Sequence, residues 1–467
     1  MNATRLRLLT SAALLSAAVI VVAFLSRRYA YDGDPVARPT REFVVVLMVA
    51  AAAYLAAVHA LVQCAASGKL LWFVFGFGAV LRIGLFFSTP ILEDDYYRYL
   101  WDGGVVAQGY NPYTHAPRSI LRAEALAPTA LVELGRESGK ILPRVNHPEL
   151  ATIYPPVAQI AFAAAHFLGP WKLSAWRGVV LFFDSATFVL LLKLLTSIGR
   201  PAHLAAIYWW NPVVLKETIN SAHMDVLALP FVLAALIFAL KSQRTRAAVA
   251  GSIAIGAKLW PLLLVPFLAR ATGLKPRTLV KPLLVFALVA GLLVGPLIYS
   301  PGIRDESGIA AYGERWEMND GFFLAYRGAA RLVARALSPD DHSAISNQIA
   351  RGGVLGTIIT ILIVLSRRPL NNAADLCRRI VLFLGAVFLL LPAQFPWYYT
   401  WVVPFLALAP RPSLLLLTLT LPLYYLKFFY DARGQVEIFH NIVVWFEYVP
   451  VYALLAYELW RERRMAR

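Results

Sequence analysis

The chain has 467 residues, of which 59% are hydrophobic and only 15% are charged. Soluble domains carry about a quarter charged residues, so this composition excludes an ordinary soluble enzyme. The formal charge of +17 does not indicate nucleic-acid binding, because the basic residues stand mostly in short loops between apolar runs, where membrane topology places them.

Apolar runs long enough to cross about 30 Å of hydrocarbon recur from end to end. The sequence therefore predicts an all-α polytopic membrane protein with about 11–13 transmembrane helices, forming a single integral domain over residues 1–467. The first run begins like a signal peptide but has no clear cleavage site, so we expect it to remain as a span. The expected spans are 8–25, 43–64, 69–88, 174–197, 203–218, 224–240, 281–299, 352–366, 379–392, 400–410, 412–429 and 440–458.

Basic loops set the expected orientation. Residues 241–246 and 270–281 are rich in Lys and Arg, and the positive-inside rule places them in the cytoplasm. The loops 89–153 and 300–350 then lie on the outer face. Four arginines in the loop 26–42 do not fit this orientation.

A broken hairpin is expected between the two basic loops. Only 23 residues, 247–269, separate them, and a segment with both ends in the cytoplasm cannot be one straight span. We expect two short helices that meet at 258–261, which is tolerated at membrane depth where protein buries the break or it lines a cavity. Residues 154–169 are also short for a span, and we expect them to be re-entrant or to lie along the membrane face.

Three consecutive carboxylates, Glu93, Asp94 and Asp95, stand at the outer end of the third expected span. Adjacent carboxylates repel one another, and partial burial raises their pKa values. A solvated cap at the membrane interface is the alternative, but the four aromatic residues that follow would keep the acids near apolar material. Asp102 comes two helical turns after Asp95, so the two would share a helix face, and Arg98 is placed to serve a phosphate.

A second polar cluster occupies the end of an expected span in YWWNPVVLKETINSAHMD (208–225). Ionisable groups inside or beside spans are costly and mark functional sites by default. Lys258, at the apex of the broken hairpin, suits a phosphate, the alternative being a lysine that snorkels to the headgroups. Asp184, in the middle of a span, is expected to pair with a lysine or a hydroxyl. The residues of the second cluster are Lys216, Glu217, Asn220, His223 and Asp225.

Five segments over residues 70–265 stand in an order that resembles the GT-C class of membrane glycosyltransferases. They are EDDYYRYLWDG (93–103), GYNPY (109–113), YPP (154–156), WNPVVLKETINSAHMD (210–225) and AKLWP (257–261). The closest likeness is to the mannosyltransferases that add the first mannose in GPI-anchor synthesis, and to their bacterial relatives.

The resemblance implies a GT-C-like fold and an inverting transfer of a hexose, with mannose suggested by the likeness alone. A positioned carboxylate would deprotonate the acceptor hydroxyl, while cations would stabilise the leaving phosphate. Asp95 is our first choice for the base, followed by Asp94 and Glu93. The donor phosphate would be bound by Lys258, Arg98 and Lys216, and the substrate pocket would be formed by Asp102, Trp101, Tyr110, Asn220, His223 and Asp225.

The expected partners follow from that chemistry. The donor would be a polyprenyl-phosphate sugar held against membrane lipid, and the acceptor a glycolipid or a glycan. The sequence leaves two alternatives for the acids, a base with a helper or a carboxylate-and-water site for Mg²⁺ or Mn²⁺. The composition and compact loops favour a bacterial inner membrane, with the active site on the outer, periplasmic face.

Two other classes of membrane protein share part of this pattern. A secondary transporter of a lipid or a sugar also uses broken helices and intramembrane charges, but its paired halves are not seen in this sequence. An O-antigen-type ligase or polymerase would concentrate its arginines and a histidine in a large loop much later in the chain.

Overall fold

The computed structural model describes residues 3–124, 127–273, 276–299, 316–337 and 342–465. This described part is almost entirely helical and contains no β-strand beyond an isolated bridge between Met318 and Ala393. Part of the expected outer loop 300–350 lies outside the described residues. The chain divides into two compact units.

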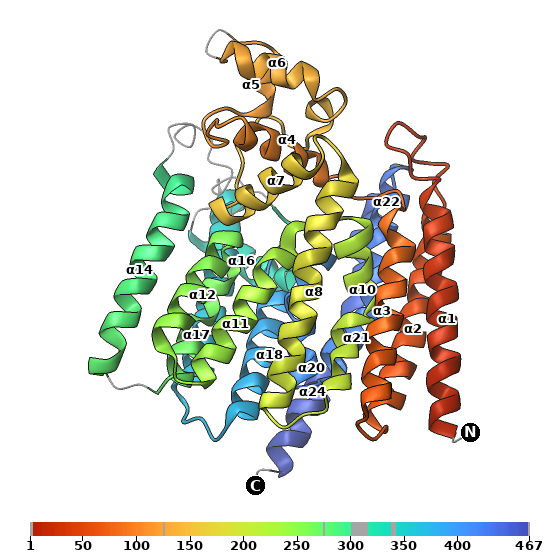
Figure 1. The fold of residues 1–467 in the computed structure, drawn as a ribbon, viewed down its shortest axis with the longest axis vertical. Helices are drawn as coiled ribbons and strands as arrows, with labels where there is room; N and C mark the ends of the chain where they lie inside the picture. The colour runs from red at the N-terminus through yellow and green to blue at the C-terminus, as the bar shows by residue number, and fades with distance from the viewer. Residues whose placement is uncertain (1–2, 125–126, 274–275, 300–315, 338–341, 466–467) are drawn as a thin grey trace. The chain divides into compact units, whose positions relative to one another are not determined.

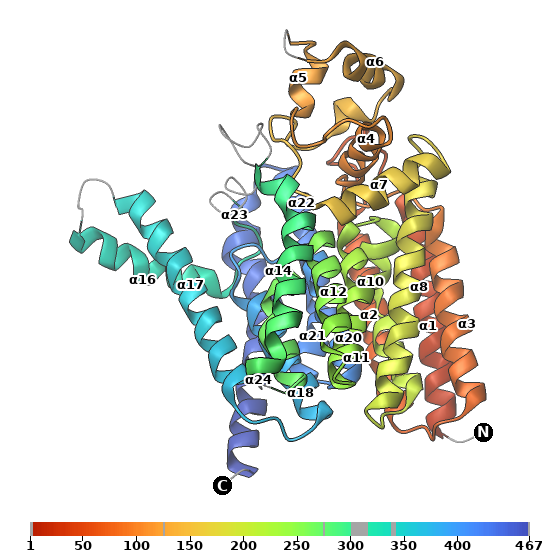
Figure 2. The ribbon, with the colours of Figure 1, turned by 60° about the vertical axis from the view of Figure 1, so that its left-hand side comes forward.

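The first unit comprises Met1–Leu81, Leu195–Leu215 and Glu317–Arg467. Within it, α1 packs along α2, α16 along α17, and α21 along α24; Figure 2 shows α16 beside α17. Its helices are α1 (Ala3–Ser26), α2 (Thr40–Val62), η2 (Ala202–Ala205), α9 (Ala206–Trp209), α10 (Pro212–Val214), α16 (Phe322–Leu337), α17 (His342–Arg367), α18 (Ala373–Leu390), α19 (Pro396–Tyr399), α20 (Val403–Leu408), α21 (Pro412–Thr420), η7 (Leu421–Tyr425), α22 (Leu426–Asp431), α23 (Val436–Ile438), η8 (Phe439–Val443) and α24 (Val444–Met465).

The second unit comprises Arg82–Leu194 and Lys216–Trp316. The helix α3 (Gly68–Phe86) begins in the first unit and ends in this one, and the π-helix η3 (Leu215–Asn220) starts at the other boundary. Its remaining helices are α4 (Tyr96–Ala107), α5 (Pro117–Leu121), α6 (Thr129–Glu137), η1 (Leu142–Arg144), α7 (Pro156–Leu168), α8 (Leu173–Ser197, whose last three residues belong to the first unit), η4 (Met224–Ala228), α11 (Leu229–Leu240), α12 (Arg244–Ala257), η5 (Trp260–Leu264), α13 (Val265–Ala271) and α14 (Pro276–Tyr299).

The helices α4 to α7 gather at one end of the long helices α8 and α12 (Figures 1 and 2). Among them, α4, α5 and α6 share a small apolar core that includes Tyr97, Trp101 and Leu134. Close packing of α4 on α7 depends on Gly103, because a Cβ atom there would stand 2.4 Å from the carbonyl oxygen of Phe162. This packing fixes the direction in which α4 leaves the acidic segment, residues 93–95.

Eight helices of the described part are long and apolar enough to cross a membrane, and one further pair, Pro212–Asn220 with Met224–Leu240, is bent by 102°. The chain is thus a multi-pass membrane protein. The count is lower than the 11–13 expected, since some expected spans are interrupted. Pro212 and Pro404 each stand in the first turn of a short helix, where proline is tolerated, and so divide the segments 203–218 and 400–410.

The broken hairpin expected at 258–261 is present. The helix α12 ends at Ala257, Lys258 has extended backbone with φ −156°, and η5 follows with Pro261 in its first turn. The chain then folds back, so that α13 returns to the start of α12. There the guanidinium of Arg244 donates to the carbonyl oxygen of Thr272 at 2.9 Å. Lys258 therefore stands at the turn between two short helices.

A buried ion pair links α3 to α8 within the second unit. The Nε atom of Arg82 lies 2.5 Å from Oδ2 of Asp184, and Nη2 lies 3.3 Å from Oδ1. Both side chains are withdrawn from solvent, with exposed fractions of 1% and 0%. The partner of Asp184 is thus an arginine, which corrects the expectation of a lysine or a hydroxyl.

Candidate active site

The acidic segment is held in place by Asn220, from the end of η3. The side-chain amide of Asn220 donates to Ser88 Oγ at 2.8 Å and to the Thr89 carbonyl oxygen at 2.7 Å, and its oxygen accepts from the Ile91 amide at 3.0 Å. Arg177 of α8 donates to the carbonyl oxygens of Phe86 and Asn220 and joins the same support. Asn220 therefore acts as a clamp between η3 and the segment that leads to the acids.

The second cluster owes its shape to a π-helix followed by a strained turn. The wider turn of η3 is a form found frequently at functional sites. Ala222 then adopts a left-handed φ of +58°, which reverses the chain, and its carbonyl oxygen accepts a hydrogen bond of 2.7 Å from the indole of Trp176. This turn brings His223 back toward Glu217.

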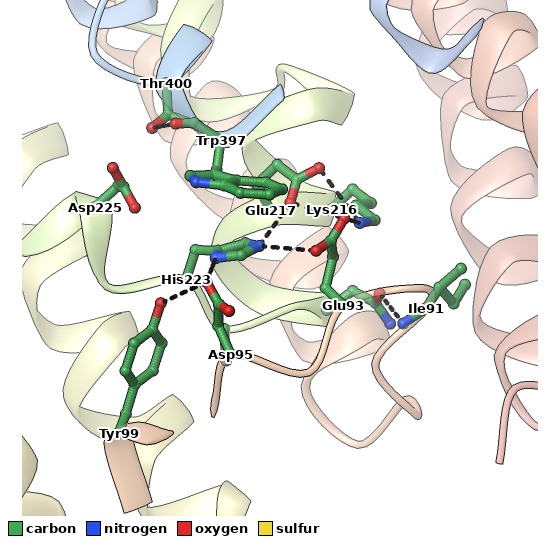
Figure 3. A network of polar contacts seen from close by, with 12 residues as sticks. Ile91, Glu93, Asp95, Tyr99, Lys216, Glu217, His223, Asp225, Trp397 and Thr400 are labelled. Atoms are coloured by element: carbon green, nitrogen blue, oxygen red, sulfur yellow. Dashed lines mark hydrogen bonds and ion pairs between the residues drawn. The ribbon is translucent and has the colours of Figure 1, made fainter. Parts of the chain in front are cut away.

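The imidazole of His223 lies among three carboxylates (Figure 3). Its Nε2 atom is 3.4 Å from Oε2 of Glu217 and 3.9 Å from Oε2 of Glu93, while its Nδ1 atom is 3.7 Å from Oδ2 of Asp95. The histidine side chain is only 1% exposed. Residues from the acidic segment and the second cluster thus form one site within the second unit.

Two lysines bring positive charge to this site. Lys216 Nζ lies 3.3 Å from Oε1 of Glu217 and 4.0 Å from Oε1 of Glu93. Lys258, from the turn of the broken hairpin, forms a 2.9 Å ion pair with Asp225 and is 19% exposed. The more exposed ammonium group, that of Lys258, is the one better placed to meet an anion arriving from outside.

The first and last acids of the acidic segment, Glu93 and Asp95, differ in their exposure to solvent. Asp95 is 32% exposed, whereas Glu93 is 8% exposed. Removal from water, and secondarily the charge of Asp94, raises the pKa of Asp95 to about 6, against the opposing charge of Lys258. Removal from water also raises the pKa of Glu93, with Lys216 opposing the rise. Asp95 is therefore the acid that combines access with a pKa near neutrality.

Asp94 and Arg98 are both engaged by the segment 146–150. The side-chain amide of Asn146 donates to Asp94 Oδ1. The guanidinium of Arg98 donates to the carbonyl oxygens of Asn146 at 2.9 Å, His147 at 2.9 Å and Leu150 at 3.1 Å. Arg98 thus holds the loop that carries Asn146 to Asp94, and its expected phosphate contact stays a prediction.

The structure does not place Asp102, Trp101 and Tyr110 among the contacts of Asp95. Asp102 is 2% exposed and accepts a 3.1 Å hydrogen bond from Gln159, and burial raises its pKa. Trp101 is 3% exposed within the apolar core around α4, and Tyr110 packs against that core. All three contribute here to the packing of α4, and their role in a substrate pocket stays a prediction.

Three residues that contact the site were not among the site residues predicted from the sequence. Glu217 was noticed in the second cluster but given no role, although it approaches both Lys216 and His223. The hydroxyl of Tyr99 lies 3.4 Å from Asp95 Oδ2, a contact that the i,i+4 spacing could have suggested. Asn146 offered no signal, because it is a lone amide 52 residues after Asp94 in the chain.

The site joins a reachable carboxylate to nearby ammonium groups, which suits proton abstraction beside a phosphate. Within the described residues, no group of three or more His, Cys, Asp or Glu side chains is arranged to hold a metal ion. Comparison with family models, with curated proteins and with solved structures gave no match.

Proposed function

We propose that the protein is an inverting membrane glycosyltransferase that transfers a hexose from a polyprenyl-phosphate donor to a lipid-linked or polysaccharide acceptor. The observation that carries this proposal is Asp95, a partly exposed carboxylate whose pKa is raised to about 6 and which feels the charge of Lys258. The GT-C-like sequence segments support the same class and favour mannose as the sugar.

In the proposed reaction the acceptor hydroxyl attacks the anomeric carbon of the donor sugar. Asp95 takes the hydroxyl proton, a bond forms between the acceptor oxygen and the anomeric carbon, and the bond from that carbon to the phosphate oxygen breaks. The polyprenyl phosphate leaves with the electron pair. Attack from the face opposite the phosphate inverts the configuration and gives an α-linked product from a β-linked donor.

The leaving group needs charge stabilisation more than it needs an acid, since a phosphate monoester anion is already stable in water. Lys258, which is 19% exposed, and Lys216, which is 1% exposed, are the ammonium groups of the site. Preorganised cations of this kind act on the charge that develops in the transition state. We assign the donor phosphate to Lys258 first, because its ammonium group is the more accessible.

The neighbouring groups would hold Asp95 ready for the reaction. His223 lies between Asp95 and the buried acids Glu93 and Glu217, and Asn220 clamps the backbone that leads to the acidic segment. In this account the active site faces the outer side of a bacterial inner membrane.

The proposal is tested by sugar transfer in membrane vesicles that contain the protein, compared with vesicles from cells that lack it. Radiolabelled mannose, glucose and arabinose donors on polyprenyl phosphate are supplied with a native lipid extract as the acceptor. We expect transfer from one donor, and we expect Lys258→Met to lower it with unchanged expression. No transfer from any donor, together with uptake of a sugar or lipid by the same vesicles, would instead support a transporter.

A further inference from the structure

An apolar groove lies between α12, α13 and α14, away from the candidate active site. Its enclosed volume is only about 50 Å³ and the rest of the groove is open to its surroundings, which suits a flexible chain lying along a surface groove better than a fully enclosed ligand. The walls are aliphatic and aromatic, with Leu268 and Val265 from α13, Leu283 and Phe286 from α14, and Gly251 from α12.

Basic side chains surround one end of this groove. Arg244, at the start of α12, lines the groove directly. Lys241 and Arg246 are exposed and flank Arg244 along the chain, Arg270 stands in the last turn of α13, and Lys281 is exposed next to Pro282, which also lines the groove. The sequence contains no Asp or Glu between Asp225 and Asp305, so no acid of this stretch offsets that charge.

The groove is distinct from the candidate active site. Arg244 and Lys258 are fourteen residues apart along α12, which corresponds to about 21 Å at 1.5 Å per residue. The basic end therefore lies near the opposite end of α12 from the lysine assigned to the donor phosphate.

The outer wall of the groove faces the membrane. Only 6% of the most apolar 18-residue stretch of α14 is buried inside the protein, and its residues Leu284, Leu288 and Leu292 are exposed. α12 and α14 pack side by side (Figures 1 and 2). A groove that opens between such helices is reached from the lipid bilayer.

We propose that this groove binds one anionic membrane phospholipid, with an acyl chain between α12 and α14 and the phosphate at Arg244. An apolar wall next to a cluster of basic residues matches the two parts of such a lipid, and basic pockets between membrane helices are known to favour anionic headgroups. A zwitterionic lipid gains less from the basic end, so the site prefers a net negative headgroup.

Gly251 offers a direct way to fill the groove. A Cβ atom at this position would meet Leu268 at 3.8 Å and Phe286 at 3.9 Å, which are ordinary contact distances, so a longer side chain extends into the groove without a backbone clash. Gly251→Leu therefore competes with the acyl chain. Gly291→Leu, in α14, is the matched control, because nothing lies within 4 Å of its Cβ position.

The test is native mass spectrometry of the detergent-solubilised full-length protein, titrated with phosphatidylglycerol or phosphatidylcholine. We expect one phosphatidylglycerol to be retained about tenfold more tightly than phosphatidylcholine, a difference of about 1.4 kcal/mol. Arg244→Gln should abolish the preference between the two lipids, while Gly251→Leu should remove the bound lipid and Gly291→Leu should leave it.

Equal retention of both lipids by the wild type, or the same affinity in Gly251→Leu and Gly291→Leu, would overturn the proposal. Displacement of phosphatidylglycerol by an equal amount of a polyprenyl phosphate would also overturn it, and would assign the groove to the tail of the donor. Because Arg244 also supports the hairpin through Thr272, the Gly251 variant keeps the test valid if Arg244→Gln fails to fold.

Discussion

The Oδ2 atom of Asp95 lies 3.7 Å from the Nδ1 atom of His223, a residue of the turn between η3 and η4. The other ring nitrogen of this histidine faces Glu93 and Glu217. The imidazole therefore separates the reachable carboxylate from two buried ones. This separation keeps Asp95 at the accessible side of the site, next to the position proposed for the acceptor hydroxyl.

Transfer should fall as the pH is lowered through about 6. The base must be ionised, and the pKa of Asp95 is raised to about 6, mainly by removal from water. Initial rates between pH 5 and pH 8 at saturating donor test this expectation. A rate that stays constant down to pH 5 would contradict the assignment of Asp95 as the base.

Asp95→Asn should raise the thermal stability of the protein at pH 7.5. The folded-state pKa, about 6, lies above the ordinary value of 3.8, so the folded state binds this proton more tightly than the unfolded state does. Ionised Asp95 therefore destabilises the fold above pH 6, and this cost disappears below about pH 4. Thermal unfolding in detergent should show a gain at pH 7.5 that is lost at pH 4, whereas the exposed Asp34→Asn should change neither.

Breaking the Arg82–Asp184 pair should destabilise the protein strongly. Either Arg82→Met or Asp184→Leu leaves a buried charge without its partner. In comparable cases this lowers the free energy of unfolding by about 3–5 kcal/mol. The double variant removes both charges and should recover most of the stability. Thermal unfolding of the four proteins tests this, and a double variant no more stable than either single one would contradict it.

Gly103→Ala should loosen the packing of α4 on α7, since its Cβ atom would stand 2.4 Å from the Phe162 carbonyl oxygen. Backbone must move to accept it, so we expect lower thermal stability and slower transfer together. Gly178→Ala in α8 is the matched control, because nothing lies within 4 Å of its Cβ position and alanine favours helix. Equal behaviour of the two variants would show that the close approach is not required.

Local sequence patterns were enough to predict much of the architecture. Hydropathy gave the long helices, and the spacing of two basic loops gave the hairpin broken at Lys258, because both properties depend on short stretches of chain. The number of spans was less predictable. Proline-started segments such as the one at Pro212 form several short helices, which hydropathy alone does not distinguish from a continuous span.

The candidate site was predictable only where charge near a span made residues conspicuous. Glu93, Asp95 and His223 were selected for that reason, and the structure brings them together. The surroundings of Arg98 and Trp101 depend on how the segment 89–153 folds. Its tertiary contacts bury Trp101 in an apolar core and direct Arg98 to backbone carbonyl groups, and no local pattern encodes either result.

The most direct test of the central claim compares Asp95→Asn with Asp94→Asn in the same vesicles, at matched expression and saturating donor. The two carboxylates are adjacent, but only Asp95 is proposed to take the acceptor proton. The account predicts a loss of about 10²–10⁴-fold in the transfer rate for Asp95→Asn and a smaller loss for Asp94→Asn. Wild-type transfer by Asp95→Asn, with activity abolished in Asp94→Asn, would contradict it.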